Sequence, residues 1–231
     1  MVCAVIVGGG KGKRMKAGIN KQYIKLAGKE IIIWTLEAFE NCSSVDEIIL
    51  VLPEDEIHSF KDGPLKKYTI SKLKAIVPGG EERQESVYNG LNACSSETDI
   101  VLIHDGARPF VPIDIINTSI DAARKYGACT AAVRVKDTIK KEDDKGFAEV
   151  GPDRSMLWSV QTPQVFKYSL IMKAHRDARR QEIIATDDTA LAEQVGYKAK
   201  LIEGSYYNIK ITTPEDIVLG EAIAEKLIKE K

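Results

Sequence analysis

The residues best suited to chemistry stand at the start of the chain, where an apolar run opens into a loop of glycines and cations. The run is Val2–Val7. It is followed by these glycines and cationic side chains: Gly8, Gly9, Gly10, Lys11, Gly12, Lys13, Arg14, Lys16 and Lys21. Glycine lets backbone N–H groups approach a ligand closely, and cations offset the charge of phosphate groups. The stretch therefore favours polyphosphate binding over a plain glycine turn beside a solvated basic patch.

Two familiar phosphate-binding motifs do not fit this loop. A P-loop ending at Gly12-Lys13 would need glycine where Val7 stands and a hydroxyl where Arg14 stands. A dinucleotide fingerprint would need glycine at Lys13 or Met15, depending on where it starts. The loop is thus a glycine turn with an arginine and, seven residues later, a lysine.

Two further glycine-bearing turns follow apolar runs. Residues 79–83 (GGEER) follow the run 73–77, and residues 105–108 (DGAR) follow the run 99–104. Because ligands of open parallel sheets bind outside the carboxyl ends of the strands, the three turns are expected to meet at one edge. Ser86 could hydrogen-bond a base or a phosphate there, or simply serve its helix terminus. Asp105 could hold Mg²⁺ or a ribose hydroxyl, or cap its own turn.

No side chain in the sequence is an obvious general base or nucleophile. His104 is expected to pack as a hydrogen-bonded core histidine, whereas His58 and His175 fall in helical surface patterns. The nucleophile-elbow pattern G-x-S-x-G is missing. A site rich in cations and poor in bases suits phosphoryl-type chemistry with an anionic nucleophile, such as a phosphate monoester whose second pKa is near ~6. Positioning and charge neutralisation would then supply most of the catalysis.

The elements that must position these residues alternate between strands and helices. The sequence predicts strands at Val2–Val7, Glu47–Leu52 and residues 73–77, 99–104, 128–133 and 198–203. It predicts helices at Ile31–Glu40, residues 54–68 with a break at Gly63-Pro64, residues 82–93, Ile113–Tyr126, Tyr168–Arg180, residues 189–195 and a last helix beginning at Thr213-Pro214. This order indicates an α/β fold, with one domain over residues 1–231 and a mostly parallel sheet covered by helices on both faces.

One segment breaks the alternation. Residues 134–157 are dominated by charge and lack helical periodicity, and Asp143-Asp144-Lys145-Gly146 is typical of a turn between two extended halves. We interpret the segment as a projecting β-arm, followed after a short strand by a turn at residues 161–164 (QTPQ). Because isolated two-stranded arms are marginally stable in water, we expect the arm to pack on a partner subunit in preference to folding back on its own domain.

Composition limits the classes of protein. Lysine and arginine number 33 against 34 aspartates and glutamates, so the net charge of −1 gives no basic excess for binding nucleic acid. No apolar run approaches the roughly 20 residues of a membrane span, and the first run is too short for a signal peptide. The scattered cysteines (Cys3, Cys42, Cys94 and Cys129) are typical of free thiols in a reducing compartment. We expect a cytoplasmic protein with no nucleic-acid or membrane partner.

Several motifs, in order along nearly the whole chain, resemble a known family. They are GGGKGKRM with Asn20-Lys21-Gln22-Tyr23, PGGEERQESVYNGL, HDGARPF, VKDTIK, LWSVQTPQ beside Arg154, TDD and EGSYYNIKITTPED. Together they are similar to the 2-C-methyl-D-erythritol 4-phosphate cytidylyltransferases of the non-mevalonate isoprenoid pathway. The resemblance implies a Rossmann-like nucleotidyltransferase domain. It implies that CTP and methylerythritol phosphate react, with Mg²⁺ or another divalent cation, to give CDP-methylerythritol and pyrophosphate. It also implies a homodimer in which the β-arm reaches the neighbour's site.

The resemblance also assigns roles to residues of this chain. The catalytic cations would be Arg14 and Lys21, which grip the triphosphate, and Arg154 and Lys210, which orient the attacking phosphate. CTP would be bound by Gly8, Gly9, Gly10, Gly12, Gly80, Ser86 and Asp105. The polyol phosphate would be bound by Asp105, Arg108, Thr138, Arg154, Thr162 and Lys210, with Thr138 and Arg154 supplied by the partner's arm. Asp105 would also be the candidate metal ligand.

Three alternatives stay open at this point. A cytidylyltransferase for ribitol 5-phosphate or another pentitol phosphate shares the glycine loop, HD-x-x-RP and QTPQ, although VKDTIK and NIKITTPED favour methylerythritol phosphate. A nucleotide-binding regulatory module without turnover is disfavoured by the full set of cations Arg14, Lys21 and Lys210. A sugar-nucleotide glycosyltransferase would normally show a D-x-D metal motif, and the fourth strand is followed here by Asp105-Gly106-Ala107 instead.

Overall fold

A twisted, mostly parallel sheet forms the centre of the structure, a computed structural model that describes residues 1–9 and 21–230. Over these residues the sheet has seven strands in the order β11-β7-β10-β6-β1-β4-β5. The strands are β1 (Val2–Val7), β4 (Glu47–Leu52), β5 (Leu73–Pro78), β6 (Ile100–Asp105), β7 (Ala128–Arg134), β10 (Trp158–Lys167) and β11 (Lys200–Glu203). Only β10 runs antiparallel to its neighbours in this described sheet, and it lies between β6 and β7.

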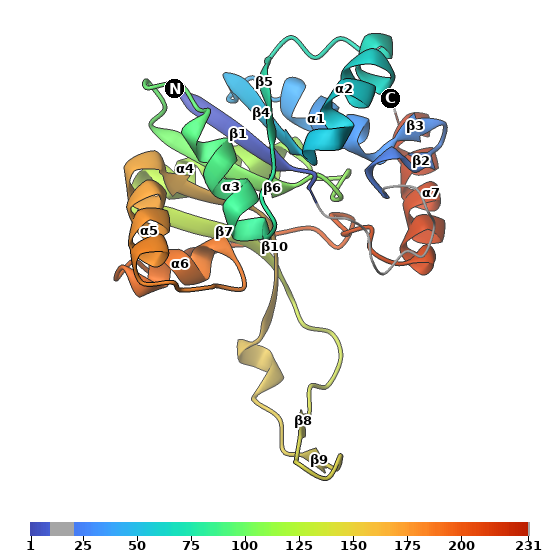
Figure 1. Ribbon diagram of the computed structural model, residues 1–231. Helices are drawn as coiled ribbons and strands as arrows, with labels where there is room; N and C mark the ends of the chain where they lie inside the picture. Colours follow the sequence, from blue (N-terminus) through green and yellow to red (C-terminus); the bar gives the residue numbers. More distant parts are fainter. Residues whose placement is uncertain (10–20, 231) are drawn as a thin grey trace.

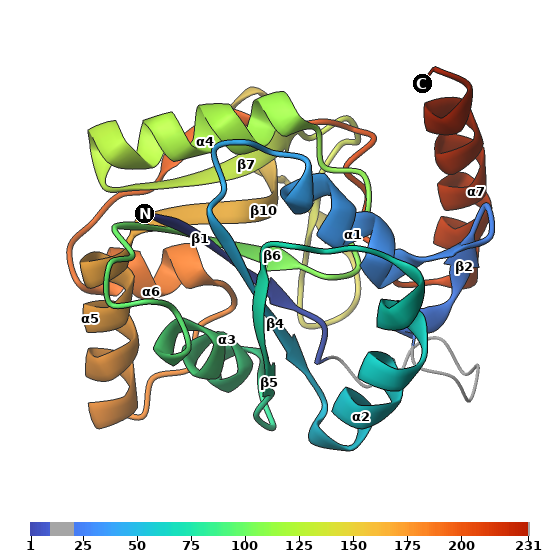
Figure 2. The same ribbon diagram turned by 90° about the horizontal axis from the view of Figure 1, so that it is seen from above.

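Helices cover both faces of the sheet, as the sequence predicts (Figures 1 and 2). The helices are α1 (Ile31–Glu40), α2 (Glu54–Asp62), α3 (Arg83–Asn92), α4 (Ile113–Tyr126), α5 (Tyr168–Arg180), α6 (Asp188–Gln194) and α7 (Pro214–Lys229). One apolar core joins the sheet to α1, α2 and α4, and a second core joins the opposite face to α3, α5 and α6. None of the helices in the described ranges is long and apolar enough to cross a membrane.

Strand β1 is apolar throughout because helices cover both of its faces. All six of its residues are buried, and neighbouring residues enter different cores: Ala4 and Ile6 pack with α1 and α4, whereas Val5 and Val7 pack with α3 and α5. Successive side chains of a strand point to opposite faces, so a strand covered on both sides has no polar face. This central strand delivers its carboxyl end, and the glycines that follow it, to one edge of the sheet.

A small hairpin and the last helix form a third layer at that edge. The hairpin joins β2 (Lys25–Leu26) to β3 (Lys29–Glu30) and follows the short 3₁₀ turn η1 (Lys21–Tyr23). Leu26 packs with α1 and α7 in a separate apolar cluster. Helix α7 begins where the sequence predicts: Thr213 and Asp216 form a reciprocal capping box, with Pro214 in the first turn.

The predicted β-arm projects away from the sheet (Figure 1). It contains the two-residue strands β8 (Lys141–Glu142) and β9 (Ala148–Glu149), and the 3₁₀ turn η3 (Arg154–Met156) leads back to β10. At the tip, the Asp143 carboxylate accepts hydrogen bonds from the backbone N–H groups of Lys145 (2.9 Å) and Phe147 (2.8 Å). The arm is therefore ordered locally by its turn, with only one short ladder within it.

The predicted turn at residues 161–164 is wrong. Strand β10 runs through these residues without a break, and its pairing with β7 shifts register between Val160 and Gln164. Pro163 lacks a backbone N–H and interrupts the ladder locally, which explains the turn-like sequence. Pairing on both sides, with β7 and from Gln164 onward also with β6, keeps the segment extended.

Candidate active site

The glycine turns after β1 and β5 meet at the carboxyl edge of the sheet. The backbone N–H of Gly8 donates to the Val51 carbonyl (2.8 Å), and a Cβ at Gly8 would lie only 2.8 Å from Leu52 Cδ2. A Cβ at Gly79 would lie 2.9 Å from the hydroxyl oxygen of Ser86. A larger residue at either position would force the side chain of Leu52 or Ser86 to shift, so the two turns fit glycine best.

Ser86 links the two turns. Its hydroxyl accepts a hydrogen bond from the Gly80 N–H (3.1 Å) and donates to the Glu82 carbonyl (3.2 Å). A Cβ at Gly9 would lie 3.4 Å from the same oxygen. The structure thus brings together Gly8, Gly9, Gly80 and Ser86, all four of which the sequence analysis places in the nucleotide site. Gly10, Gly12 and Arg14 lie outside the described residues, and Lys21 is described only as the backbone start of η1.

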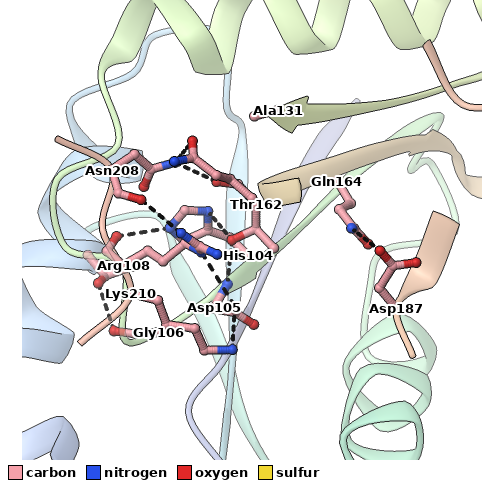
Figure 3. Close-up of polar contacts among 12 residues, drawn as sticks. His104, Asp105, Gly106, Arg108, Ala131, Thr162, Gln164, Asp187, Asn208 and Lys210 are labelled. Carbon is pink, nitrogen blue, oxygen red and sulfur yellow. Dashed lines mark hydrogen bonds and ion pairs between the residues drawn. The ribbon is translucent and has the colours of Figure 1, made fainter. Parts of the chain in front are cut away.

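Asp105, the last residue of β6, is the centre of a cationic cluster (Figure 3). Its Oδ2 lies 2.8 Å from Lys210 Nζ and 3.6 Å from Arg108 Nε, and its Oδ1 lies 3.3 Å from Arg83 Nε. The residue is only 7% exposed. Burial opposes ionisation, but the charges of Arg83, Lys210 and Arg108 outweigh it and hold the pKa of the carboxyl well below its usual range. The site therefore contains a permanent buried anion that holds cations on both of its oxygens.

His104 and Thr162 hold the backbone of Asp105 through a chain of hydrogen bonds (Figure 3). His104 Nε2 lies 3.0 Å from the Arg108 carbonyl oxygen, which can only accept, so Nε2 carries the proton. Nδ1 must then accept the hydroxyl hydrogen of Thr162 (3.1 Å), while the Thr162 oxygen accepts from the Asp105 backbone N–H (3.0 Å). Burial lowers the pKa of His104 to about 4, so the imidazole is neutral and fixes this chain of hydrogen bonds.

Asn208 is a site residue that the sequence analysis missed. It is fully buried, and its side-chain amide donates to the Thr162 carbonyl (2.8 Å) and to Gln161 Oε1 (3.2 Å). Its own backbone carbonyl accepts from Arg108 Nη1 (2.8 Å). Asn208 therefore fixes the guanidinium of Arg108 beside Asp105. The only sequence signal was its place two residues before Lys210 in the motif EGSYYNIK.

Comparison with known proteins identifies the family. A family model described as IspD, 2-C-methyl-D-erythritol 4-phosphate cytidylyltransferase, matches residues 2–226. The chain belongs to this family. A relative from Clostridium botulinum named 2-C-methyl-D-erythritol 4-phosphate cytidylyltransferase is 50% identical, covering 96% of this chain and 97% of its own. Another relative of the same name, from Clostridium perfringens, is 51% identical over 95% of this chain and 97% of its own.

Solved structures agree with this membership in the 2-C-methyl-D-erythritol 4-phosphate cytidylyltransferase family. The 4-diphosphocytidyl-2C-methyl-D-erythritol synthase from Anaerococcus prevotii has a TM-score of 0.86 and 35% identity, covering 97% of this chain and 96% of its own. The family enzyme from Thermus thermophilus has a TM-score of 0.78 and 33% identity, covering 97% of this chain and all of its own. The resemblance seen in the motifs, the Rossmann-like nucleotidyltransferase fold and the classification as a nucleotidyltransferase are confirmed, and the pentitol-phosphate alternative is not favoured.

The residues that the resemblance assigns to the polyol phosphate fall into two groups in this structure. Arg108, Thr162 and Lys210 are gathered around Asp105 as the resemblance implies. Thr138 and Arg154 are not: both are exposed on the arm, and Arg154 donates from Nη1 to the carbonyl of Lys136 (2.9 Å). Within one chain the arm therefore contributes nothing to the Asp105 cluster.

A second buried charge lies next to the cytidylyltransferase site. Asp188, the first residue of α6, is 1% exposed, and its Oδ2 lies 2.8 Å from Arg83 Nη1. His175 Nε2 is 3.6 Å from the other oxygen of this carboxylate. The prediction that His175 lies on the surface is wrong: the residue is fully buried, because α3 and α6 both pack against its helix.

Proposed function

We propose that this chain transfers the cytidylyl group of CTP to 2-C-methyl-D-erythritol 4-phosphate. A phosphate oxygen of the acceptor attacks the α-phosphorus, the bond from that phosphorus to the β-phosphate oxygen breaks, and pyrophosphate leaves with the electron pair. No proton has to be removed from the nucleophile, because a phosphate monoester is largely dianionic above its second pKa of about 6. This agrees with a described site that holds partly buried cations and a neutral His104, and family membership supports the choice of substrates.

The proposal rests on Asp105, whose two carboxylate oxygens contact cations on different sides of the site. Its Oδ1 contacts Arg83, which begins the helix that carries Ser86, and its Oδ2 contacts Lys210 and Arg108. A nucleotide lying over the glycine turns and a phosphate lying near Lys210 would therefore meet above one carboxylate. Such an arrangement can align an attacking phosphate with a triphosphate and reduce the repulsion between them.

On the nucleotide side, we propose that backbone groups of the glycine turns and Ser86 read the cytosine. The proposed set is Gly8, Gly9, Gly10, Gly12, Gly80 and Ser86. Arg14 and Lys21 would grip the triphosphate and stabilise the charge that develops at the α-phosphorus during transfer. Asp105 would hold the ribose or the metal region at the junction with the acceptor.

On the acceptor side, we propose that Lys210 and Arg108 hold the polyol phosphate. Lys210 Nζ is partly exposed and reaches Asp105 from the segment before α7, so it can turn toward an incoming phosphate. Thr162 would act mainly through position, because its hydroxyl is already bonded to His104 and to the Asp105 N–H. Its two bonds hold the Asp105 backbone where the two substrates would meet.

We propose that Thr138 and Arg154 complete this site from the arm of a partner subunit in a homodimer. Several apolar side chains of the arm are exposed in the single chain, among them Phe147 (69%), Val150 (86%) and Met156 (77%). Side chains of this kind need a surface to cover them, and a two-stranded arm is not stable without one. A second copy of this chain would provide the cover, and we place the assembly in the cytoplasm.

We propose that a divalent cation, Mg²⁺ or another, binds together with CTP. Among the described residues, no group of three His, Cys, Asp or Glu side chains could hold a metal ion. Mg²⁺ in nucleotide sites typically uses one or two carboxylates together with substrate phosphates, so the single carboxylate of Asp105 fits such a shared site but not an all-protein cage. When bound, the cation would offset negative charge on the triphosphate.

The proposal is tested by a side-by-side assay of the purified chain with CTP and Mg²⁺. Methylerythritol 4-phosphate and ribitol 5-phosphate are supplied separately, and pyrophosphate release is followed. We expect rapid turnover with methylerythritol phosphate and little with ribitol 5-phosphate. Preferential turnover of ribitol 5-phosphate would replace the acceptor, and the absence of pyrophosphate with either acceptor would overturn the proposed reaction.

A further inference from the structure

Arg83 connects two buried carboxylates that come from distant parts of the chain. Its Nη1 lies 2.8 Å from Asp188 Oδ2 and its Nε lies 3.3 Å from Asp105 Oδ1. Asp188 is 1% exposed and Asp105 is 7% exposed. Hydrogen bonds between charged groups are roughly twice as strong as neutral ones, and partial burial reduces their screening by water. The guanidinium is thus held from two sides, with Asp188 as the closer partner.

Asp188 itself is held firmly in place. Its backbone N–H donates to Gln164 Oε1 (3.0 Å), and Gln164 Nε2 donates to Asp187 Oδ2 (3.1 Å), a contact visible in Figure 3. Asp187 caps α6 by accepting from the Ala190 N–H (2.8 Å). The Asp188 carboxylate therefore projects from a capped helix end fixed to the central strand β10, and it forms a stiff support for Arg83.

The segment before Asp188 also supports the start of α3. Gln84 donates from Nε2 to the Ile183 carbonyl (3.1 Å) and accepts from the Ala185 N–H at Oε1 (3.1 Å). Residues 183–188 thus contact both of the first two residues of α3, the helix that carries Ser86 and follows Gly80. Loosening this support would displace the nucleotide side of the site, where Asp105 Oδ1 and Ser86 lie.

The acceptor side depends less on these contacts, although it shares the Asp105 carboxylate with Arg83. Lys210 and Arg108 reach the other oxygen of Asp105, and Arg108 is held separately by the carbonyl of Asn208. The remaining groups around Asp188 are His175, at 3.6 Å from Oδ1, and the ring of Tyr88 beyond it. Neither of them approaches Lys210 through any contact in the described chain. The two sides of the site therefore share Asp105, but the acceptor side has an additional support of its own in the contact between Arg108 and Asn208.

We propose that Asp188 is a positioning residue for CTP: acting through Arg83, it fixes Asp105 Oδ1 and the start of α3 in the arrangement that binds the nucleotide. This inference rests on the proposed function and adds a residue to which no substrate contact is assigned. Burial works against the charge of Arg83, but Asp188 and then Asp105 raise the pKa of its guanidinium above the ordinary value, in line with a permanently paired cation.

The test is the substitution Asp188→Asn, which keeps the shape of the side chain and removes its charge. Glu193→Gln is the matched control, because it removes the same charge from an exposed position of the same helix. We expect Asp188→Asn to raise both the Kd for CTP, measured by calorimetry with Mg²⁺, and the KM for CTP by on the order of tenfold. The KM for methylerythritol phosphate should stay within about twofold of the parent value, and the control should match the parent in all three.

A double variant, Arg83→Gln with Asp188→Asn, removes both charges and separates positioning from folding. We expect it to regain much of the thermal stability that Asp188→Asn loses, since the excess positive charge left around Asp105 is removed with Arg83, but not the CTP affinity. An unchanged Kd for CTP in Asp188→Asn, or equal increases in the KM of both substrates, would overturn the inference. So would a recovery of CTP affinity in the double variant.

Calorimetry keeps this test independent of the reaction. If the parent chain binds CTP but does not release pyrophosphate with either acceptor, the proposed function fails while the Kd comparison still decides the role of Asp188. If the parent does not bind CTP at all, both the proposed function and the inference are refuted.

Discussion

The buried imidazole of His104 should make the stability of this protein depend on pH in a window where most carboxylates are already ionised. In the folded chain its pKa is about 4, against an ordinary value of 6.5. Below the ordinary value the unfolded chain binds a proton that the folded chain does not, so the free energy of unfolding must fall as the pH falls toward 4. With these two pKa values, the loss between about pH 7 and about pH 5 is about 2 kcal/mol.

The physical origin is burial, which outweighs the favourable effects of the Arg108 carbonyl and of Asp105 on the charged ring. The ring is fully buried and lies 4.9 Å from the ring of Phe39, where a charged imidazolium is poorly solvated. Protonation of Nδ1 would also force the Thr162 hydroxyl hydrogen to turn away, so that the Thr162 oxygen would accept from both the imidazolium and the Asp105 N–H. The folded structure therefore resists the second proton of His104.

The measurement is urea denaturation across this pH range for the parent chain and for His104→Gln. The variant will be less stable at neutral pH, but its free energy of unfolding should change by about 2 kcal/mol less between the two pH values. His58→Gln is the control, because the His58 side chain is 92% exposed and pairs with Asp62 only at the surface, so most of the loss on acidification should remain in this variant. If His104→Gln loses as much stability as the parent on acidification, the assignment of the pH dependence to His104 is refuted.

Three other changes test the rest of the site. Asp105→Asn should destabilise the fold by about 3 kcal/mol and abolish turnover, because it leaves partly buried Arg108 and neighbouring Lys210 without their anion; urea midpoints within experimental error of the parent would contradict this. Chelation with EDTA should stop pyrophosphate release without lowering the melting temperature, since the described residues form no metal cage; a large drop in melting temperature would indicate a structural metal. Mixing inactive Arg154→Ala and Lys210→Ala chains under subunit exchange should restore about a quarter of parent activity if the arm serves its partner, and no recovery would place both residues in one chain's site.

Local sequence patterns predicted the helices well where hydrophobic periodicity was the only signal in the segment. The helices Ile31–Glu40, Ile113–Tyr126 and Tyr168–Arg180 have the predicted bounds. The error at residues 161–164 arose because Pro163 favours a turn locally, whereas the paired residues on either side of it, Val160 with β7 and Gln164 with both β7 and β6, keep the strand extended. His175 was misplaced because the pattern of one helix says nothing about what packs on its polar side, here α3 and α6.

The part of the site that lies directly after the strands could be predicted from the sequence. The rule that ligands bind at the carboxyl ends of parallel strands placed Gly8, Ser86 and Asp105 at one edge, and the structure confirms that they lie there. Lys210 and Thr162 came only from the family resemblance, because nothing local ties them to Asp105. The contact between Arg83 and Asp188 joins residues 105 positions apart, and no periodicity along the chain encodes such a pair.

The arm grows out of two strands that are already paired inside the sheet. Strand β7 ends at Arg134 and β10 begins at Trp158, and these two residues face each other in the antiparallel ladder. A chain inserted or deleted beyond this pair changes the arm alone, because the register of β10 around Thr162 is set from within the sheet. The length and shape of the arm can therefore change without disturbing Thr162 and the Asp105 cluster of the same chain, while the reach of Thr138 and Arg154 toward a partner changes with the arm.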